Sequence, residues 1–292
     1  MTLYATLDYT KQNMLAQEST DDANLITQIR EVSQRIDRMF MPKRRAPVFA
    51  PYIETRNNYR LTSDRVDSWE GTFRFGEPLL ALSGVTAGTT TLTVGTTVQL
   101  YQGDLSPYLN LQLLNRCCGG WYQYIRCSGC ETLPFVSITG TWGYNVDYPS
   151  SWVNTLQSIQ NVAGIDADDT SITVLDPEAA NANGYAPCLS VGNLLQIDSE
   201  WLEVTAVNTS TNAITVRRGV NGSTAAAHNN GTAIYTFAVE ETVKRATARQ
   251  AAFQLAKFGA YDNQAVSGIG SVDFAPDVLF EFSSLLSLFA NM

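Results

Sequence analysis

One long helical pattern, Val239–Gly259, arrives only after a long stretch of strand-like sequence, and this order restricts how the chain can fold. Apolar or small residues recur along one side of it at helical spacing, at Val239, Val243, Ala246, Phe253 and Ala256. Lys244, Arg245 and Arg249 fall off that side, and Gly259 stands where a helix C-cap belongs. An amphipathic helix needs an apolar partner, so its partner is expected far away in the sequence.

The matching pattern is near the N-terminus, in Asp21–Met41, which follows a Ser19-x-x-Asp22 start signal. Its apolar stripe consists of Leu25, Ile26, Ile29, Val32, Ile36, Met39 and Phe40. A short helix is expected at Leu7–Gln17, and Pro42 ends the helical pattern. The predicted fold class is therefore α+β: a helical bundle of residues 1–46 and 239–292 with large antiparallel β domains, barrel-like or sandwich-like, inserted between its helices.

The inserted sequence divides into a first β region at 47–158 and a second β module at 159–238. In the first, Trp69–Phe75 and Phe135–Tyr144 alternate as half-buried strands do, and Asn145–Thr155 has the turn residues of a linker. In the second, Trp201–Val207 is expected to pair with Ala213–Arg217 across the turn 208–212. Short strands with Asn and Gly turns are typical of a small barrel or sandwich.

The bulk composition excludes some classes of protein. The chain has 292 residues and a formal net charge of −9, and this negative charge disfavours sequence-independent binding to DNA. The basic run Lys43–Arg45 is interpreted as a solvated helix end. The N-terminus lacks the apolar region of a signal peptide, and no apolar run is long enough to span a membrane, so no membrane contact is expected. Five cysteines, an odd number, favour a reducing cytoplasm over a disulfide framework.

Four cysteines lie close together in the first β region: Cys117, Cys118, Cys127 and Cys130. Four thiolates are enough for a tetrahedral zinc site, but adjacent cysteines seldom ligate one ion. Disulfides formed after release from the cell, or free and partly buried thiols, are the other readings of this cluster, and free thiols are favoured. Cys188 stands alone and is interpreted as a small apolar residue.

No residue set predicts catalysis. His228, the single histidine, lies in a Gly- and Asn-rich turn and is interpreted as an ordinary loop residue. Asp166, Asp168 and Asp169 resemble a calcium loop superficially, but the required Gly and Glu are missing, which favours a turn before a strand. There is no GxxxxGK phosphate loop. Neither enzymatic activity nor a cofactor is expected.

Four pieces of the sequence together resemble the head-to-tail connector adaptors of tailed bacteriophages. They are Tyr4–Phe40, Val136–Trp152, Gly192–Phe237 and Val239–Tyr261. The third piece is similar to a β module common in phage structural proteins. The insertion 100–134, with its cysteines, has no counterpart in the family.

The resemblance implies a structural virion protein of the neck, assembled in the host cytoplasm. About twelve copies would form a ring beneath the portal protein and receive stopper or tail-terminator proteins below. Genomic DNA would pass through without specific binding, because about twelve copies at −9 each give a formal charge near −108 that repels phosphates.

The C-terminal segment is the expected portal-binding element. Pro276 opens a helical pattern, Ala275–Phe289, whose apolar side is made of Val278, Leu279, Phe282, Leu285, Leu286 and Phe289. Such an apolar helix needs a partner, either the portal or the core of its own subunit. The alternative function is a β-rich virion surface module that binds glycans through Trp142, Tyr144 and Trp152; such aromatic residues, with Tyr148 beside them, more often close a hydrophobic core.

Overall fold

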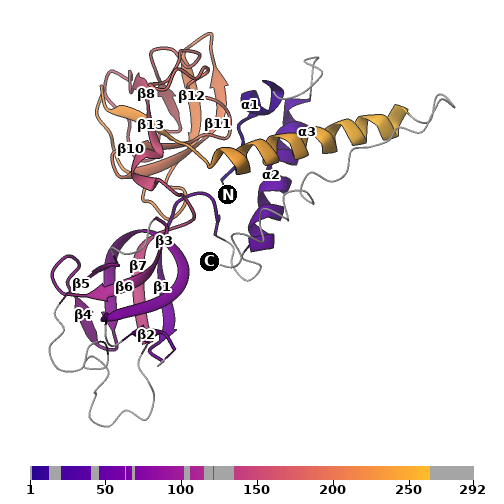
Figure 1. Ribbon diagram of the computed structural model, residues 1–292. Coiled ribbons are helices and arrows are strands. Elements are labelled where there is room, and N and C mark those ends of the chain that lie inside the picture. The colour runs from indigo at the N-terminus through magenta and orange to yellow at the C-terminus, as the bar shows by residue number, and fades with distance from the viewer. Residues whose placement is uncertain are drawn as a thin grey trace. The chain divides into compact units, whose positions relative to one another are not determined.

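Figure 1 shows the computed structural model of the protein, which describes residues 2–12, 21–40, 46–62, 64–67, 70–101, 106–114, 121 and 135–263. For Asn58 and residues 256–263 only the backbone is described. The chain forms two compact units, one of Met1–Ala50 with Ser150–Met292 and the other of Pro51–Pro149. Each unit is considered separately below.

The helices and strands follow one another along the chain in an order dominated by strands. They are α1 (Leu7–Gln12), α2 (Asp22–Phe40), β1 (Tyr52–Arg60), β2 (Val66–Asp67), β3 (Thr72–Ala87), β4 (Thr90–Leu92), β5 (Val98–Leu100), β6 (Tyr108–Leu113), β7 (Phe135–Trp142), the 3-10 helix η2 (Tyr148–Ser150), β8 (Trp152–Ser158), β9 (Ser171–Thr173), β10 (Leu194–Ile197), β11 (Glu200–Asn208), β12 (Ala213–Arg217), β13 (Ala233–Phe237) and α3 (Glu241–Asn263).

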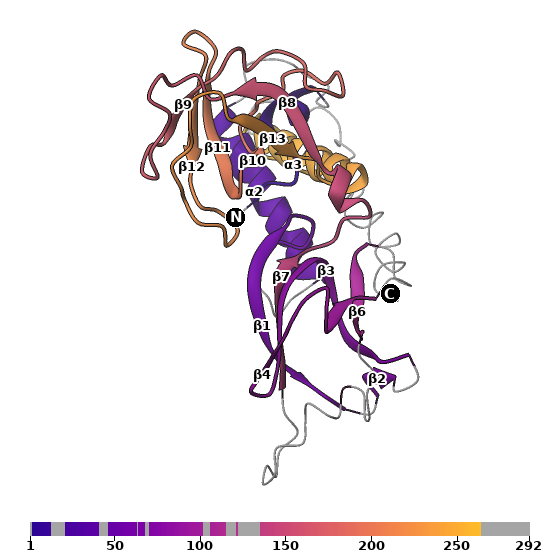
Figure 2. The same ribbon diagram turned by 90° about the vertical axis from the view of Figure 1, so that its left-hand side faces the viewer.

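The unit Pro51–Pro149 is built around the long strand β3. Its described strands form one antiparallel sheet in the order β1-β7-β3-β6-β5, and β2 and β4 also pair with β3. Figure 2 shows β1, β7, β3 and β6 of this sheet. The pairing of β3 with β6 shifts register between Arg74 and Leu79, where Gly76 has a positive φ of 75°. This bulge bends the strand and lets one strand contact four neighbours. The sheet encloses a core that includes Trp142, Tyr59 and Phe75.

Gly140 in β7 marks a close approach between neighbouring strands. A Cβ atom at this position would collide with the backbone carbonyl oxygen of Ala81 in β3 and would lie 2.9 Å from the side chain of Leu79. The Ala81 carbonyl belongs to the backbone of a central strand, so it cannot move aside without shifting the sheet. Gly84 in β3 is different, since a Cβ there would meet Thr139 at an ordinary 3.5 Å.

These two glycines give a matched test of the packing in this unit. Gly140→Ala is expected to lower the unfolding free energy of the unit by about 1–3 kcal/mol, because the sheet must shift to admit a methyl group. Gly84→Ala is expected to change it by less than about 1 kcal/mol. Hydrogen exchange of the β3 and β7 amides measures both effects, and equal effects of the two substitutions would contradict this packing.

The second sheet belongs to the unit that also holds the helices. Its described strands are antiparallel in the order β8-β13-β10-β11-β12-β9. The predicted pairing of Trp201–Val207 with Ala213–Arg217 is confirmed, since β11 and β12 form a hairpin whose turn has Asn212 at a φ of 49°. The core of this sheet consists of buried aliphatic side chains such as Ile172, Leu195 and Ile214. The segment predicted as a linker, Asn145–Thr155, contains the start of β8.

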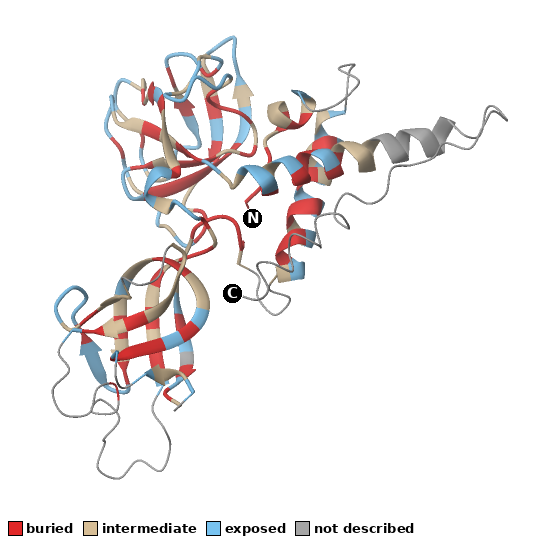
Figure 3. Ribbon diagram, viewed as in Figure 1, coloured by how far each residue is buried: buried red, intermediate tan, exposed pale blue. Residues whose placement is uncertain are grey.

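The predicted helices near both ends of the chain are present. In α2 the residues Leu25, Ile29, Val32 and Ile36 are fully buried, whereas Met39 is 43% exposed. Figure 3 shows the buried parts of the helices in red. Asp21 caps this helix by accepting a hydrogen bond from the amide of Asn24 at 3.3 Å. α3 contacts both α1 and α2. The predicted C-cap at Gly259 is wrong, because α3 continues to Asn263.

The predicted fold class is also wrong. The described chain is mostly β, with two antiparallel sheets and three helices, and it is not a helical bundle with inserted β domains. The helices do not form a separate bundle, because they belong to the same unit as the β8–β13 sheet. The buried N-terminal segment Leu3–Ala5 and α1 contact loops of the β8–β13 sheet, so the helices and that sheet share one compact unit. No helix of the described residues is long and apolar enough to cross a membrane.

Candidate functional site

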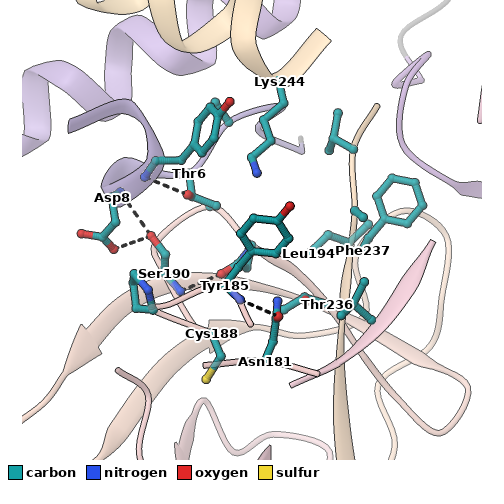
Figure 4. Close-up of a pocket in the computed structure, with 18 of the residues that line it drawn as sticks. Thr6, Asp8, Asn181, Tyr185, Cys188, Ser190, Leu194, Thr236, Phe237 and Lys244 are labelled. Atoms are coloured by element: carbon teal, nitrogen blue, oxygen red, sulfur yellow. Dashed lines mark hydrogen bonds between the residues drawn. The ribbon is translucent and has the colours of Figure 1, made fainter. Parts of the chain in front are cut away.

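A cavity of about 350 Å³ lies beside α1 in the unit that holds the helices (Figure 4). We call it the α1 cavity. The start of α1, the loop 181–194 and the junction between β13 and α3 form its walls. Its lining includes Leu3, Thr6, Asp8, Tyr9, Val153, Asn181, Asn183, Tyr185, Cys188, Ser190, Leu194, Thr236, Phe237, Glu241 and Lys244.

Backbone and side-chain hydrogen bonds fix α1 against one wall of the α1 cavity. The Leu7 amide donates to the carbonyl of Val191 at 3.0 Å, and the Asp8 amide donates to Ser190 Oγ at 3.3 Å. The Ser190 hydroxyl in turn donates to Asp8 Oδ2 at 2.5 Å. Amides in the first turn of a helix have no partner within the helix, so the loop supplies partners for two of them.

Lys244, in the first turns of α3, closes the opposite wall. Its ammonium group lies 3.9 Å from the centre of the Tyr9 ring and 3.7 Å from Glu241 Oε2. Desolvation lowers the pKa of Lys244, although Glu241 opposes this shift. The Tyr9 hydroxyl donates to Glu241 Oε1 at 2.7 Å. Desolvation is the main cause that raises the pKa of Tyr9, and this hydrogen bond is the second. The three side chains thus form one charged and aromatic group.

Tyr185 stands at the mouth of the α1 cavity on a tightly braced loop. Asn181 Oδ1 accepts from the amides of Asn183 and Tyr185 at 2.9 and 3.1 Å, and Gly184 between them has a φ of 81°. The Ala182 amide donates to the carbonyl of Asn154 in β8 at 2.9 Å. The loop therefore has a defined shape, yet the Tyr185 side chain is left 71% exposed.

A second cluster of ionisable groups, centred on the buried His228, lies in the same unit, and only its Asp198 is largely exposed. His228 Nδ1 lies 2.8 Å from Asp198 Oδ2, and its Nε2 lies 2.8 Å from Glu200 Oε2. Arg218 forms a bidentate pair with Glu200, with Nε and Nη2 at 2.8 and 2.7 Å from the two carboxylate oxygens. The Glu200 side chain is 0% exposed and that of Arg218 is 6% exposed.

The cluster connects three loops to β11. Arg218 Nη1 also donates to the carbonyls of Asp166 and Asp169 at 2.7 and 2.8 Å. Burial alone would raise the pKa of Glu200, but hydrogen bonds from Arg218, His228 and two backbone amides lower it overall. The side chains of His228 and Glu200 are only 2% and 0% exposed, and every polar atom of the Glu200 carboxylate already has a protein partner. We interpret the cluster as a structural one, and His228 is not the ordinary loop residue that its sequence context suggested.

The aspartate segment forms a turn. The Asp166 amide donates to Asp169 Oδ2 at 2.8 Å, and the Asp169 amide donates to the Asp166 carbonyl at 3.2 Å. Within the described ranges no group of three or more His, Cys, Asp or Glu side chains is placed to hold a metal ion. The segment therefore serves to position Arg218 and the start of β9.

The aromatic residues proposed for glycan binding belong to two different units. Trp142 is 0% exposed in the Pro51–Pro149 unit, where Arg56 lies 4.0 Å from the centre of its ring. Trp152 belongs to the other unit and lies between Trp201 and Phe237, at centroid distances of 5.8 and 5.2 Å. A glycan cannot stack on Trp142, because that ring is inside a core.

The predicted portal-binding residues and the four clustered cysteines all lie outside the described residues. These are Pro276, Val278, Leu279, Phe282, Leu285, Leu286 and Phe289, and the cysteines Cys117, Cys118, Cys127 and Cys130. Cys188 is buried, as its interpretation as an apolar residue requires, and its thiol lies 3.4 Å from the carbonyl of Pro177. Desolvation raises the pKa of this thiol to about 11, so it stays protonated.

The comparisons with known proteins identify no relative. A scan against protein-family models finds no family that matches the chain, and a search of curated proteins also finds no match. The resemblance to connector adaptors stays a prediction from the quoted sequence pieces.

Proposed function

We propose that the protein is a structural subunit of the head-to-tail connector of a tailed bacteriophage. About twelve copies form a ring that joins the portal protein to stopper or tail-terminator proteins. The role is mechanical, and no catalytic step is assigned to it. The sequence resemblance motivates this proposal, and the course of α3 is the observation that supports it best.

α3 carries the chain away from the β8–β13 sheet. It starts shortly after β13 and crosses α2, and Figure 1 shows it leading away from the sheet. Its 23 residues correspond to about 34 Å at about 1.5 Å per residue. The apolar segment Pro276–Phe289 follows this helix in the chain. A long helix that leaves the sheet after its last strand suits a subunit that docks on a portal ring through residues beyond that sheet.

A single charged substitution in that segment tests the proposal. Leu286→Asp places a carboxylate on the apolar side of the predicted helix, so binding to the portal ring of the same virus is expected to weaken at least tenfold. Ser284→Asp adds the same charge on the opposite side and is expected to leave binding within about threefold. Surface plasmon resonance on immobilised portal rings measures both variants; the proposal fails if Leu286→Asp binds as tightly as the unmodified protein.

A further inference from the structure

The α1 cavity combines an exposed aromatic ring with uncommitted neutral polar groups. We propose that it binds a neutral, hydroxyl-rich ring, such as one monosaccharide unit of a glycan. Its volume of about 350 Å³ lies within the range of small-ligand sites. This assignment concerns residues of one subunit and does not rest on the proposed connector ring.

Tyr185 supplies the apolar face that such a ligand needs. A tyrosine side chain that is 71% exposed on a braced loop keeps a flat apolar surface in water. In Figure 4 it lies centrally among the lining residues, with Lys244 reaching toward it from α3. The C–H groups of a sugar ring are apolar on one face, so they stack on an aromatic ring while the hydroxyls stay free for hydrogen bonds.

Neutral polar groups are free to meet those hydroxyls. Among the described residues, no hydrogen bond engages the side-chain amide of Asn183 or the hydroxyl of Tyr185. An amide offers two donors and an acceptor, and a phenol offers one donor and an acceptor. Sugar hydroxyls also both donate and accept, so they match this set.

The charges of the lining disfavour an anionic ligand. Asp8 and Glu241 are negative and Lys244 is positive, which leaves one net negative charge in the lining. Lys244 is already engaged by the Tyr9 ring and Glu241. A phosphate would therefore meet net repulsion and no free cation, whereas an uncharged ring would not.

Saturation-transfer difference NMR of the full chain with glucose, galactose and N-acetylglucosamine at millimolar concentrations tests the proposal. We expect at least one of the three sugars to bind, and glucose 6-phosphate to bind less well than glucose. Tyr185→Ala is expected to weaken that binding about tenfold by removing the stacking face. Leu175→Ala removes a side chain that is 56% exposed outside the cavity and serves as the control, with no effect expected.

Asn183→Leu provides a second variant, and thermal melting verifies that each variant is folded. Asn183→Leu is expected to weaken binding about tenfold while leaving the Asn181 bonds to the loop backbone in place. The proposal is overturned if none of the three sugars binds, if glucose 6-phosphate binds more tightly than glucose, or if binding survives both cavity substitutions unchanged.

Discussion

Replacing Arg218 with methionine is expected to lower the unfolding free energy of the β8–β13 sheet by about 3–5 kcal/mol, because a buried carboxylate loses its partner. Arg218 makes both of its bonds to Glu200 inside the protein, where the Glu200 side chain is 0% exposed. It also holds the turn at Asp166–Asp169 through two carbonyls. A fifth hydrogen bond runs from Arg218 Nη2 to the carbonyl of Ala226. The substitution therefore removes five hydrogen bonds and leaves Glu200 with His228 and backbone amides as partners.

Arg245→Met is the control for this experiment. Arg245 lies in the same unit and faces Glu241 at 3.9 Å, but both side chains are 55% exposed. Exposed pairs contribute little, so a loss of less than about 1 kcal/mol is expected. Hydrogen exchange of the β10 and β11 amides reports on the sheet itself. Similar losses for the two variants would show that the buried cluster does not hold these loops in place.

Asp37→Asn is expected to remove a pH dependence of stability in the helical part of the same unit. Asp37 accepts hydrogen bonds from the Tyr4 hydroxyl and from the Val48 amide, the latter at 2.9 Å. Desolvation raises the pKa of this buried carboxyl from 3.8 to about 6. The folded state thus holds the proton more tightly than the unfolded state does. This contribution to stability is fully present below about pH 4 and is lost as the pH rises through about 6.

The difference in pKa corresponds to about 3 kcal/mol at 1.36 kcal/mol per pH unit. The stability of the unmodified protein relative to Asp37→Asn is therefore expected to fall by about this amount between pH 4 and pH 7. Hydrogen exchange of the α2 amides at several pH values measures it. A constant difference between the two proteins across this range would contradict the assignment.

Tyr4→Phe adds a directional check on the same pair. The Tyr4 hydroxyl lowers the pKa of Asp37, so its removal is expected to move the pH dependence to higher pH. The variant also leaves the Phe49 amide without the acceptor that it has at 3.0 Å, and a general loss of about 1–3 kcal/mol accompanies the shift. A shift to lower pH would contradict this account of the pair.

Patterns in the sequence correctly predicted the elements that are formed by residues close together in the chain. The β11–β12 hairpin follows from alternation on both sides of an Asn-rich turn, and the buried face of α2 follows from 3.6-residue spacing. Two predicted ends of elements were wrong. The strand predicted at Trp69–Phe75 continues in the structure through the bulge at Gly76 as part of β3, and the predicted cap Gly259 is accommodated within α3. Tertiary pairing outweighs a local cost of about 1 kcal/mol at such positions.

The fold class and the clusters depend on contacts between distant residues, so the sequence did not reveal them. Helical periodicity showed that α2 and α3 need partners, but it did not show that α1 packs against a loop of the β8–β13 sheet. His228 meets carboxylates 30 and 28 positions earlier in the chain. The buried Arg218 and its exposed neighbour Arg217 look alike in the sequence. Only the alternation of buried and exposed residues at the end of β12 separates them.

Mass photometry of the purified protein, alone and mixed with the portal ring of the same virus, tests the proposed function most directly. We expect the portal ring to gain the mass of about twelve subunits of 32.0 kDa each. A portal ring that gains no mass beside a stable monomer or trimer would contradict the connector assignment.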